Sequence, residues 1–416
     1  MAALAPAFAR TWSGTTPIPD GVYLDLEPEV YFDQVALGST DLIRLFQQEQ
    51  GWWWSSRWNP RYVRPKNPFQ NYGSATHAIT LEGVKVYEAR YAVAPDYDRI
   101  PDLFDKVEDI KAYMAGQGFA VSGPRAPKGV SKWTKPDWVQ ALIDSGLEDA
   151  PCRSLVQQRF EEKIGKRDIL TPAEDWSLRL MREVMLDPDR DDNHDIREAF
   201  AEGGEHPALA EVSIFHTFPD GLRRRWRVDR MFGNFDLDLK TLGNWSGRPL
   251  EYETGHVITV KGYDIQRADY AYGRTVAYAY IGVDRLHGGS AEQRAWLRTF
   301  PAAFPTWDWK WLFYQKPDSK AGRAPVIFPV HDDHDSERLR VGHTKALKAM
   351  NTFRTNVARW GLEKPWAKVA PMHFTDEVRY PGAPLVRFPH FIDSVELPPD
   401  ADAWSYEGAA QGGGEP

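Results

Sequence analysis

The sequence of 416 residues carries a formal net charge of −8, and this acidic balance argues against a protein that binds nucleic acid by simple electrostatic attraction. It leaves room for an enzyme that acts on DNA, because acidic residues can hold a metal ion while basic residues gather locally. The one cysteine, Cys152, excludes disulfide bonds within the chain and a four-cysteine zinc or iron–sulfur site, and it fits a reducing, cytoplasmic setting.

The N-terminal part of the chain lacks the apolar core of a signal peptide. We find no apolar run in the sequence that is long enough to span a membrane. Residues 1 to about 35 contain scattered Pro, Gly and Thr without periodicity, and we expect a loosely ordered arm there. The pattern Ser39-Thr40-Asp41 before an apolar run predicts a short amphipathic helix. A basic, Trp-rich stretch at 52–64 suits either stacking on bases or a packed loop anchored by tryptophans.

The sequence pattern predicts a mostly helical region from residue 73 to about residue 210. Residues 73–83 predict the start and body of a helix that carries His77, a lone histidine whose default role is structural. A strand is expected over residues 86–95. Residues 96 to about 205 are polar and mostly helical in pattern, and we expect them to form an insertion.

From residue 210 the pattern changes to strands. Residues 210–218 alternate apolar and polar positions, and turn signals at Pro219-Asp220-Gly221 and Gly233-Asn234 separate two further strands. We therefore expect a three-stranded antiparallel meander. Downstream, the sequence predicts a helix closed by Gly273, strands over 275–283, 309–316 and 324–330, and a long amphipathic helix over 336–361.

Two carboxylates and a lysine are expected close together on this meander. Asp229 lies in its second strand, and Asp238 and Lys240, two residues apart, share one face of its third strand. Crowded carboxylates resist ionising unless a cation neutralises them, and Mg²⁺ is a hard cation that oxygen ligands bind. A lysine beside such an ion can orient a water or stabilise charge on a phosphate. A surface hairpin with solvated side chains would show the same short pattern.

Neighbouring residues could complete the same site. Glu211, at the entrance of the first strand, could point to the same pocket as Asp229. Gln266 and Tyr270 are four residues apart and share one helix face, where they either face the site or pack as a core stripe. Three arginines alternate along the second strand, and they either contact a phosphate backbone or form a solvated face: Arg223, Arg225 and Arg227.

Four pieces of sequence occur in an order that is similar to a known family. They are GSATHAITLEG (73–83), AEVSIFH (210–216), RVDRM (227–231) with DLKT (238–241), and KGYDIQRADY (261–270). They resemble the G-T-A-x-H-x-x-x-L-E segment, the E-x-S strand, the R-x-D and D-L-K-T core and the G-Y-x-x-Q-x-x-x-Y helix of phage and prophage exonucleases of the RecE type, within the PD-(D/E)XK nuclease superfamily. Ser74 stands where Thr is common, and Val228 stands where the superfamily's name has proline.

The resemblance implies an α/β fold with a PD-(D/E)XK restriction-endonuclease-like core, in which helices flank a central mixed sheet. Residues 36–396 would form a single nuclease domain, with a helical insertion at about 96–205, a catalytic core at about 206–330 and a flexible tail at 397–416. The implied metal ligands are His77, Asp229, Asp238 and the carbonyl group of Leu239. The implied catalytic group comprises Lys240, with Asp229, Asp238, Glu211, Gln266 and Tyr270 around it.

The activity that the resemblance implies is Mg²⁺-dependent 5′-to-3′ digestion of linear double-stranded DNA, with Mn²⁺ as a substitute ion. It leaves 3′ single-stranded overhangs for phage-type homologous recombination. The implied partners are DNA ends, a single-strand annealing protein and further copies of the chain, in the cytoplasm of a bacterial host that carries the phage or prophage. An endonuclease or single-strand-specific nuclease of the same fold, or a catalytically silent DNA-binding homologue, stays an open alternative.

Overall fold

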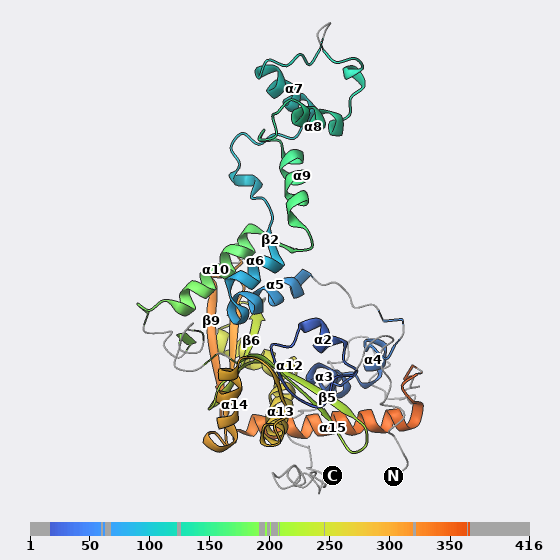
Figure 1. The fold of residues 1–416 in the computed structure, drawn as a ribbon, viewed down its shortest axis with the longest axis vertical. Helices are drawn as coiled ribbons and strands as arrows, with labels where there is room; N and C mark the ends of the chain where they lie inside the picture. The colour runs from blue at the N-terminus through green and yellow to red at the C-terminus, as the bar shows by residue number, and fades with distance from the viewer. Residues whose placement is uncertain are drawn as a thin grey trace, which may run out of the picture. The chain divides into compact units, whose positions relative to one another are not determined.

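The computed structural model describes residues 17–59, 61–62, 68–122, 126–190, 196–197, 200, 207, 209–244, 246–318, 322–363 and 365–366 (Figure 1). The chain divides into two compact units, one made by Met1–Pro65 with Ala201–Pro416 and the other by Lys66–Phe200. The tail expected at 397–416 lies outside the described residues. None of the described helices is both long and apolar enough to cross a lipid bilayer.

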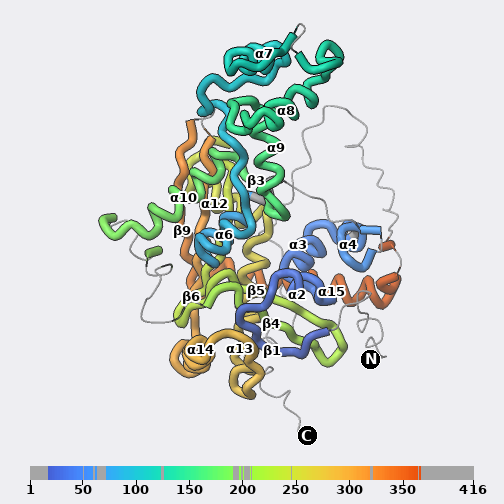
Figure 2. Tube along the Cα trace, turned by 45° about the horizontal axis from the view of Figure 1, so that its top comes forward, coloured from blue at the N-terminus to red at the C-terminus, as the bar shows by residue number. Residues whose placement is uncertain are grey.

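A mixed sheet of seven strands lies at the centre of the first unit (Figures 1 and 2). The strands are β1 (Gly21–Leu24), β4 (Ala210–Thr217), β5 (Arg223–Met231), β6 (Phe235–Leu242), β7 (Leu286–Gly288), β8 (Asp308–Gln315) and β9 (Val326–Asp332). Their order across the sheet is β7-β1-β4-β5-β6-β8-β9. The pairs β7/β1 and β6/β8 are parallel and the other neighbours are antiparallel. The predicted α/β class, the mixed sheet and the β4-β5-β6 meander are therefore confirmed.

Three helices of the first unit begin at polar caps that the sequence supplies. Asp41 accepts the backbone N–H of Gly38, and Ser290 and Ser336 accept the N–H groups of Gln293 and Leu339, so otherwise unpaired donors are satisfied. These three are α3 (Ser39–Gln47), α14 (Ala291–Ala303) and α15 (Glu337–Trp360), and the unit also contains α2 (Pro28–Asp33), α4 (Glu49–Trp54), α12 (Leu250–Val260) and α13 (Tyr263–Gly282). The predicted helices at Ser39 and at 336–361 are confirmed.

Helix α13 packs tightly against the sheet on one side and against α15 on another. A Cβ atom at Gly273 would lie 2.6 Å from Cγ of Trp226 on β5, so the glycine lets the helix approach the indole ring. A Cβ atom at Gly342 of α15 would lie 2.3 Å from the carbonyl oxygen of Asp264. These two contacts set the position of α13, and with it the polar side chains that α13 carries toward β6.

The Trp-rich stretch forms a second core with α15. Trp52, Trp53 and Trp58 are buried, and the ring of Trp52 lies 4.8 Å from that of Trp366. The indole N–H groups of Trp52 and Trp53 donate to Asp41 and to the carbonyl of Leu362. The predicted packing of this stretch by its tryptophans is therefore confirmed for these three residues, although Trp52 and Trp53 belong to helix α4 and not to a loop.

The second unit is mostly helical and has its own small apolar core. Its helices are α5 (Pro68–His77), the π-helical turn η1 (Ala78–Glu82), α6 (Val84–Arg90), α7 (Val107–Gly116), α8 (Lys135–Asp144), α9 (Arg153–Ile164) and α10 (Pro172–Leu186), with the single-turn 3₁₀ segments η2 (Tyr97–Arg99) and η3 (Val130–Lys132). The short strands β2 (Tyr91–Val93) and β3 (Asp168–Leu170) pair in parallel. The unit begins at Lys66, well before the position of about 96 that the sequence suggested.

The strand expected over 275–283 is wrong, because α13 continues to Gly282. Four residues of this stretch are buried at helical spacing: Val276, Ala277, Tyr280 and Ile281. The sequence suggested a strand because β-branched and aromatic residues, which favour strands, are frequent there. Gly273 lies inside the helix and does not end it. Its role is to leave space for the Trp226 ring. The break comes earlier, at Gly262, whose φ of 71° separates α12 from α13.

Two N-terminal expectations also need correction. Part of the segment expected to be a loose arm is ordered, because β1 pairs with β4 and β7 and α2 follows it. These partners lie far away in the sequence, and no local pattern announces them. The strand expected over 86–95 is half helix, because α6 continues to Arg90, and only Tyr91–Val93 is a strand.

Candidate active site

Asp238 and Lys240 form an ion pair on β6. The Lys240 ammonium nitrogen lies 2.8 Å from one carboxylate oxygen of Asp238 and 2.7 Å from the other. The side chain of Asp238 is 2% exposed and that of Lys240 is 15% exposed, so the pair is largely removed from solvent. The period of a strand places both residues on one face, as the sequence predicted.

Asp229 reaches the same strand from β5. The ladder between β5 and β6 runs from Met231 and Asp236 to Arg230 and Leu237. One residue further along β5, the Asp229 carboxylate accepts the backbone N–H of Leu239 at 2.8 Å. Leu239 lies between Asp238 and Lys240, so this side chain brings the second carboxylate to the same place. The structure therefore joins the three residues that the sequence expected to meet.

Helix α13 covers this group with polar side chains. The Gln266 amide donates to Asp238 at 3.2 Å, and the Lys240 ammonium lies 4.9 Å from the ring centre of Tyr263. Tyr270 is buried one turn beyond Gln266, where its ring lies 5.6 Å from Trp309. Gln266 thus contacts the predicted site directly, whereas Tyr270 belongs both to the helix face and to the core.

The electrostatics of this group keep Lys240 charged. Burial alone would lower the pKa of Lys240, but the carboxylates of Asp238 and Asp229 outweigh it, and the pKa is raised above its usual value. Burial raises the pKa of Tyr270 well above its usual value, and the charges of Asp229 and Asp238 act in the same direction. At neutral pH Lys240 is therefore an ammonium ion and Tyr270 a neutral phenol.

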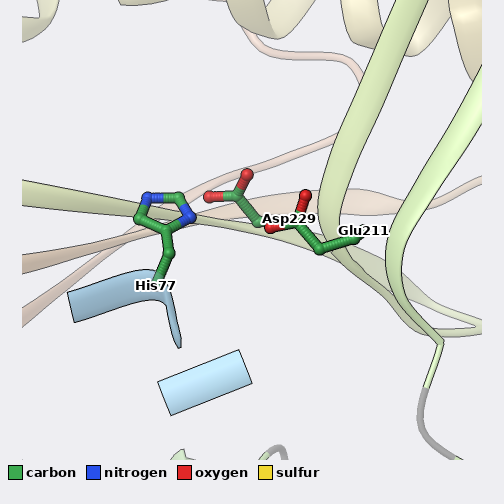
Figure 3. A group of neighbouring side chains, drawn as sticks. All are labelled: His77, Glu211 and Asp229. Carbon is green, nitrogen blue, oxygen red and sulfur yellow. The ribbon is translucent and has the colours of Figure 1, made fainter. Parts of the chain in front are cut away.

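Glu211 adds a third carboxylate at the same end of the sheet. The register between β4 and β5 pairs Ala210 with Arg230 and Val212 with Val228, so Glu211 stands opposite Asp229. One carboxylate oxygen of each lies within 4.8 Å of the other, and Figure 3 shows the two groups side by side. The φ of Glu211 is 54°, a strained value for a residue with a side chain, and such strain concentrates at functional sites. Glu211 also pairs with Arg227.

His77, which Figure 3 also labels, ends α5 in the second unit. Its predicted role as a metal ligand stays a prediction. The same holds for the carbonyl of Leu239.

The three arginines predicted to contact DNA already have partners within the protein. Arg225 donates to the carbonyl oxygens of Tyr31, Phe32 and Gln34 at 2.8–3.0 Å. Arg223 donates to the carbonyl of Ile18, and Arg227 pairs with Glu211. The ordered N-terminal segment and β4 thus supply acceptors for these arginines, and a contact with phosphate would have to compete with these acceptors. Their predicted role in DNA binding stays a prediction.

Sequence reasoning missed two buried ion pairs that hold α13 to the sheet. Arg274 pairs with Asp236 at 2.7 Å, and both side chains are fully buried. Arg224 pairs with Asp269 at 2.6 Å and is equally buried. Burial raises the pKa of both aspartates, and the arginine partners oppose this effect. Charged residues spaced along an otherwise apolar helix were the available signal, because such residues are rarely buried unless they are paired.

Comparison with known proteins identifies no family. No protein-family model matches the chain, and no curated protein matches it.

Proposed function

We propose that this protein is a metal-dependent deoxyribonuclease that digests linear double-stranded DNA from its ends, in the manner of the RecE-type exonucleases. One observation carries the proposal. Two carboxylates on adjacent strands, Asp229 and Asp238, meet at a partly buried Lys240 that is paired to one of them. The order of the sequence motifs supports the same superfamily. A 5′-to-3′ direction, a ring of several copies and an annealing partner belong to the proposal through the resemblance.

The residues at this site fit a hard divalent cation. Asp229, Asp238 and Glu211 offer carboxylate oxygens, and Mg²⁺ or Mn²⁺ binds oxygen ligands in preference to sulfur. The oxygens of Glu211 and Asp229 are close enough to share one ion. These residues would hold the ion, with the Leu239 carbonyl and His77 as further predicted ligands. When bound, it would supply a Lewis acid that offsets charge on a phosphate and lowers the pKa of a water.

Lys240 has the charge and the support to act on a phosphate. Because its pKa is raised, Lys240 carries three N–H donors at neutral pH and can donate to a phosphate oxygen or to a water. The carboxylate of Asp238 and the ring of Tyr263 restrict where its ammonium group can go. Gln266 in turn fixes the orientation of Asp238. A positioned donor of this kind typically contributes a factor of about 100 or more in rate.

The test is digestion of linear duplex DNA labelled at the 5′ or the 3′ end, with Mg²⁺ or with EDTA. The expected result is Mg²⁺-dependent release of label from the 5′ end. Lys240→Ala should lower the rate by about 100-fold or more. Lys163→Ala is the matched control, because that lysine is exposed on α9 and should leave the rate unchanged.

Other outcomes separate the alternatives. Cleavage of circular duplex DNA would replace the exonuclease with an endonuclease of the same fold. Digestion of single strands alone would favour the single-strand-specific enzyme, for which the stretch 52–64 offers the exposed ring of Trp54 but not the buried rings of Trp52, Trp53 and Trp58. DNA binding without Mg²⁺-dependent cleavage of any substrate would leave the silent homologue.

A further inference from the structure

A second group of metal-binding side chains lies in the first unit at one end of the β8/β9 pair. Strand β8 begins at Asp308, and the antiparallel strand β9 brings Asp332 beside Trp309 and His331 beside Lys310. The chain then turns through Asp333 and His334 into α15. Two aspartates and two histidines therefore converge where the two strands and the helix meet, and none of them belongs to the candidate active site.

Asp308, His331 and Asp333 offer ligand atoms that all lie within 4.8 Å of one another, and His334 lies beside Asp308. Nε2 of His331 lies 3.3 Å from Oδ2 of Asp308 and 3.1 Å from Oδ1 of Asp333. Nδ1 of His334 lies 3.3 Å from Oδ1 of Asp308. Bonds of about 2.0–2.2 Å to a tetrahedral Zn²⁺ hold ligand atoms about 3.3–3.6 Å apart, close to the separations of His331 from Asp308 and Asp333. The side chain of His334 would have to turn to bring its Nδ1 atom to the same ion.

The loop that carries these groups is held from inside. Between His331 and Asp333, the side chain of Asp332 points inward, where it accepts from the Ser336 hydroxyl at 3.0 Å and from Arg338 at 3.4 Å. The His334 backbone N–H donates to Asp308 at 2.9 Å. The backbone is therefore tied at both ends of the group, while the side chains of His331 and Asp333 are 50% and 71% exposed and accessible to an ion from solvent.

We propose that Asp308, His331, Asp333 and His334 form a zinc site that ties the start of β8 to the junction between β9 and α15. Two imidazoles with two carboxylates are a nitrogen and oxygen ligand set that suits Zn²⁺, whereas Mg²⁺ prefers oxygen alone. The site is thus chemically distinct from the carboxylate-rich group around Asp229. Ion pairs between protonated histidines and aspartates would have the same side-chain distances without binding metal.

Calorimetric titration of the full chain with Zn²⁺, in excess Mg²⁺ at neutral pH, tests this proposal. The wild-type protein should bind one Zn²⁺ that Mg²⁺ does not displace, and Zn²⁺ should raise its melting temperature. His331→Ala and His334→Ala should each weaken binding by more than the roughly 10- to 100-fold that loss of an outer-shell partner costs. His256→Ala, an exposed histidine on α12, is the matched control and should bind as the wild type does.

Two further variants make the outcome decisive. Asp229→Asn should keep the zinc affinity, because it alters only the candidate active site. Asp333→Asn, at a largely exposed position, replaces His331→Ala if that variant fails to fold. Absence of Zn²⁺ binding, unchanged affinity in the histidine variants, or loss of binding in Asp229→Asn alone would each overturn the proposal.

Discussion

The backbone N–H of Leu239 donates a 2.8 Å hydrogen bond to the carboxylate of Asp229. The backbone pairing between β5 and β6 ends just before this point, and the Asp229 side chain serves as the acceptor for Leu239 where a backbone carbonyl group would otherwise do so. The contact explains why two like charges on neighbouring strands are held together, since one is anchored to the backbone and the other to the Lys240 ammonium. It also indicates which substitutions separate structure from chemistry.

Asp229→Asn should abolish activity while leaving the fold intact. The asparagine amide oxygen can still accept from Leu239, so the free energy of unfolding should change by about 1 kcal/mol or less. The lost charge should lower Mg²⁺ affinity and reduce the rate of DNA cleavage by about 100-fold or more. Cleavage assays and urea unfolding measure the two effects. Asp284→Asn, at a side chain that is 76% exposed, is the control, and equal loss of activity in both variants would contradict the assignment.

Arg274→Met should be strongly destabilising, because it leaves Asp236 buried without its charge partner. The expected loss in the free energy of unfolding is about 3–5 kcal/mol, measured by urea denaturation. Arg298→Met breaks an exposed pair with Asp284 and should cost less than about 1 kcal/mol. The double variant Asp236→Leu with Arg274→Met should recover much of the loss. A similar cost for the two single variants would show that the buried pair does not hold α13.

Gly273→Ala should push α13 away from β5. The added Cβ atom would lie 2.6 Å from the Trp226 ring, and overpacking of this kind costs about 1–3 kcal/mol. Gly255→Ala on α12 has no atom within 4 Å of the new Cβ, so the better helix propensity of alanine should stabilise it by about 0.5–1 kcal/mol. Thermal unfolding of both variants checks the opposite signs. Two stabilising results would mean that the helix does not pack this closely.

Acid should destabilise the protein through His343. Burial, with the positive charge of Arg267, lowers the pKa of His343 to about 4 from 6.5. Between pH 6.5 and about 4, the unfolded chain binds a proton at this histidine that the folded chain does not bind. The free energy of unfolding therefore decreases steadily as the pH falls from 6.5 to about 4. The full effect is about 3 kcal/mol at most.

His343→Gln should flatten this part of the pH profile. Urea unfolding at a series of pH values measures the slope, and the exposed His256→Gln serves as its control. An unchanged slope between pH 6.5 and 4 in His343→Gln would place the acid sensitivity elsewhere.

Local pattern was enough to predict the centre of the sheet and most of its candidate site. Alternation along 210–218 and the turn at Gly233-Asn234 depend on neighbours in the chain, and they predicted the β4-β5-β6 meander correctly. The strand period of two correctly predicted that Asp238 and Lys240 share one face, and helical spacing predicted that Gln266 can face them. The cap at Ser336 and an amphipathic pattern likewise predicted α15.

Only the tertiary structure decided how distant segments use these elements. The sequence predicted that Arg225 contacts DNA, yet the carbonyl groups of Tyr31 and Phe32 accept hydrogen bonds from it, because β1 and α2 are ordered beside the sheet. Helix α13 runs past Gly273, where the lack of a side chain lets the Trp226 ring approach, and residues 275–283 do not encode this contact by themselves. Breaking one buried ion pair costs about 3–5 kcal/mol, whereas the helix propensities of ordinary residues differ by less than about 1 kcal/mol each. Contacts between remote segments therefore outweigh local propensity. Sequence spacing therefore predicted that Asp238, Lys240 and Gln266 share one place. Strand pairing and long-range packing decided which carboxylates join them and which charges are buried around the candidate site.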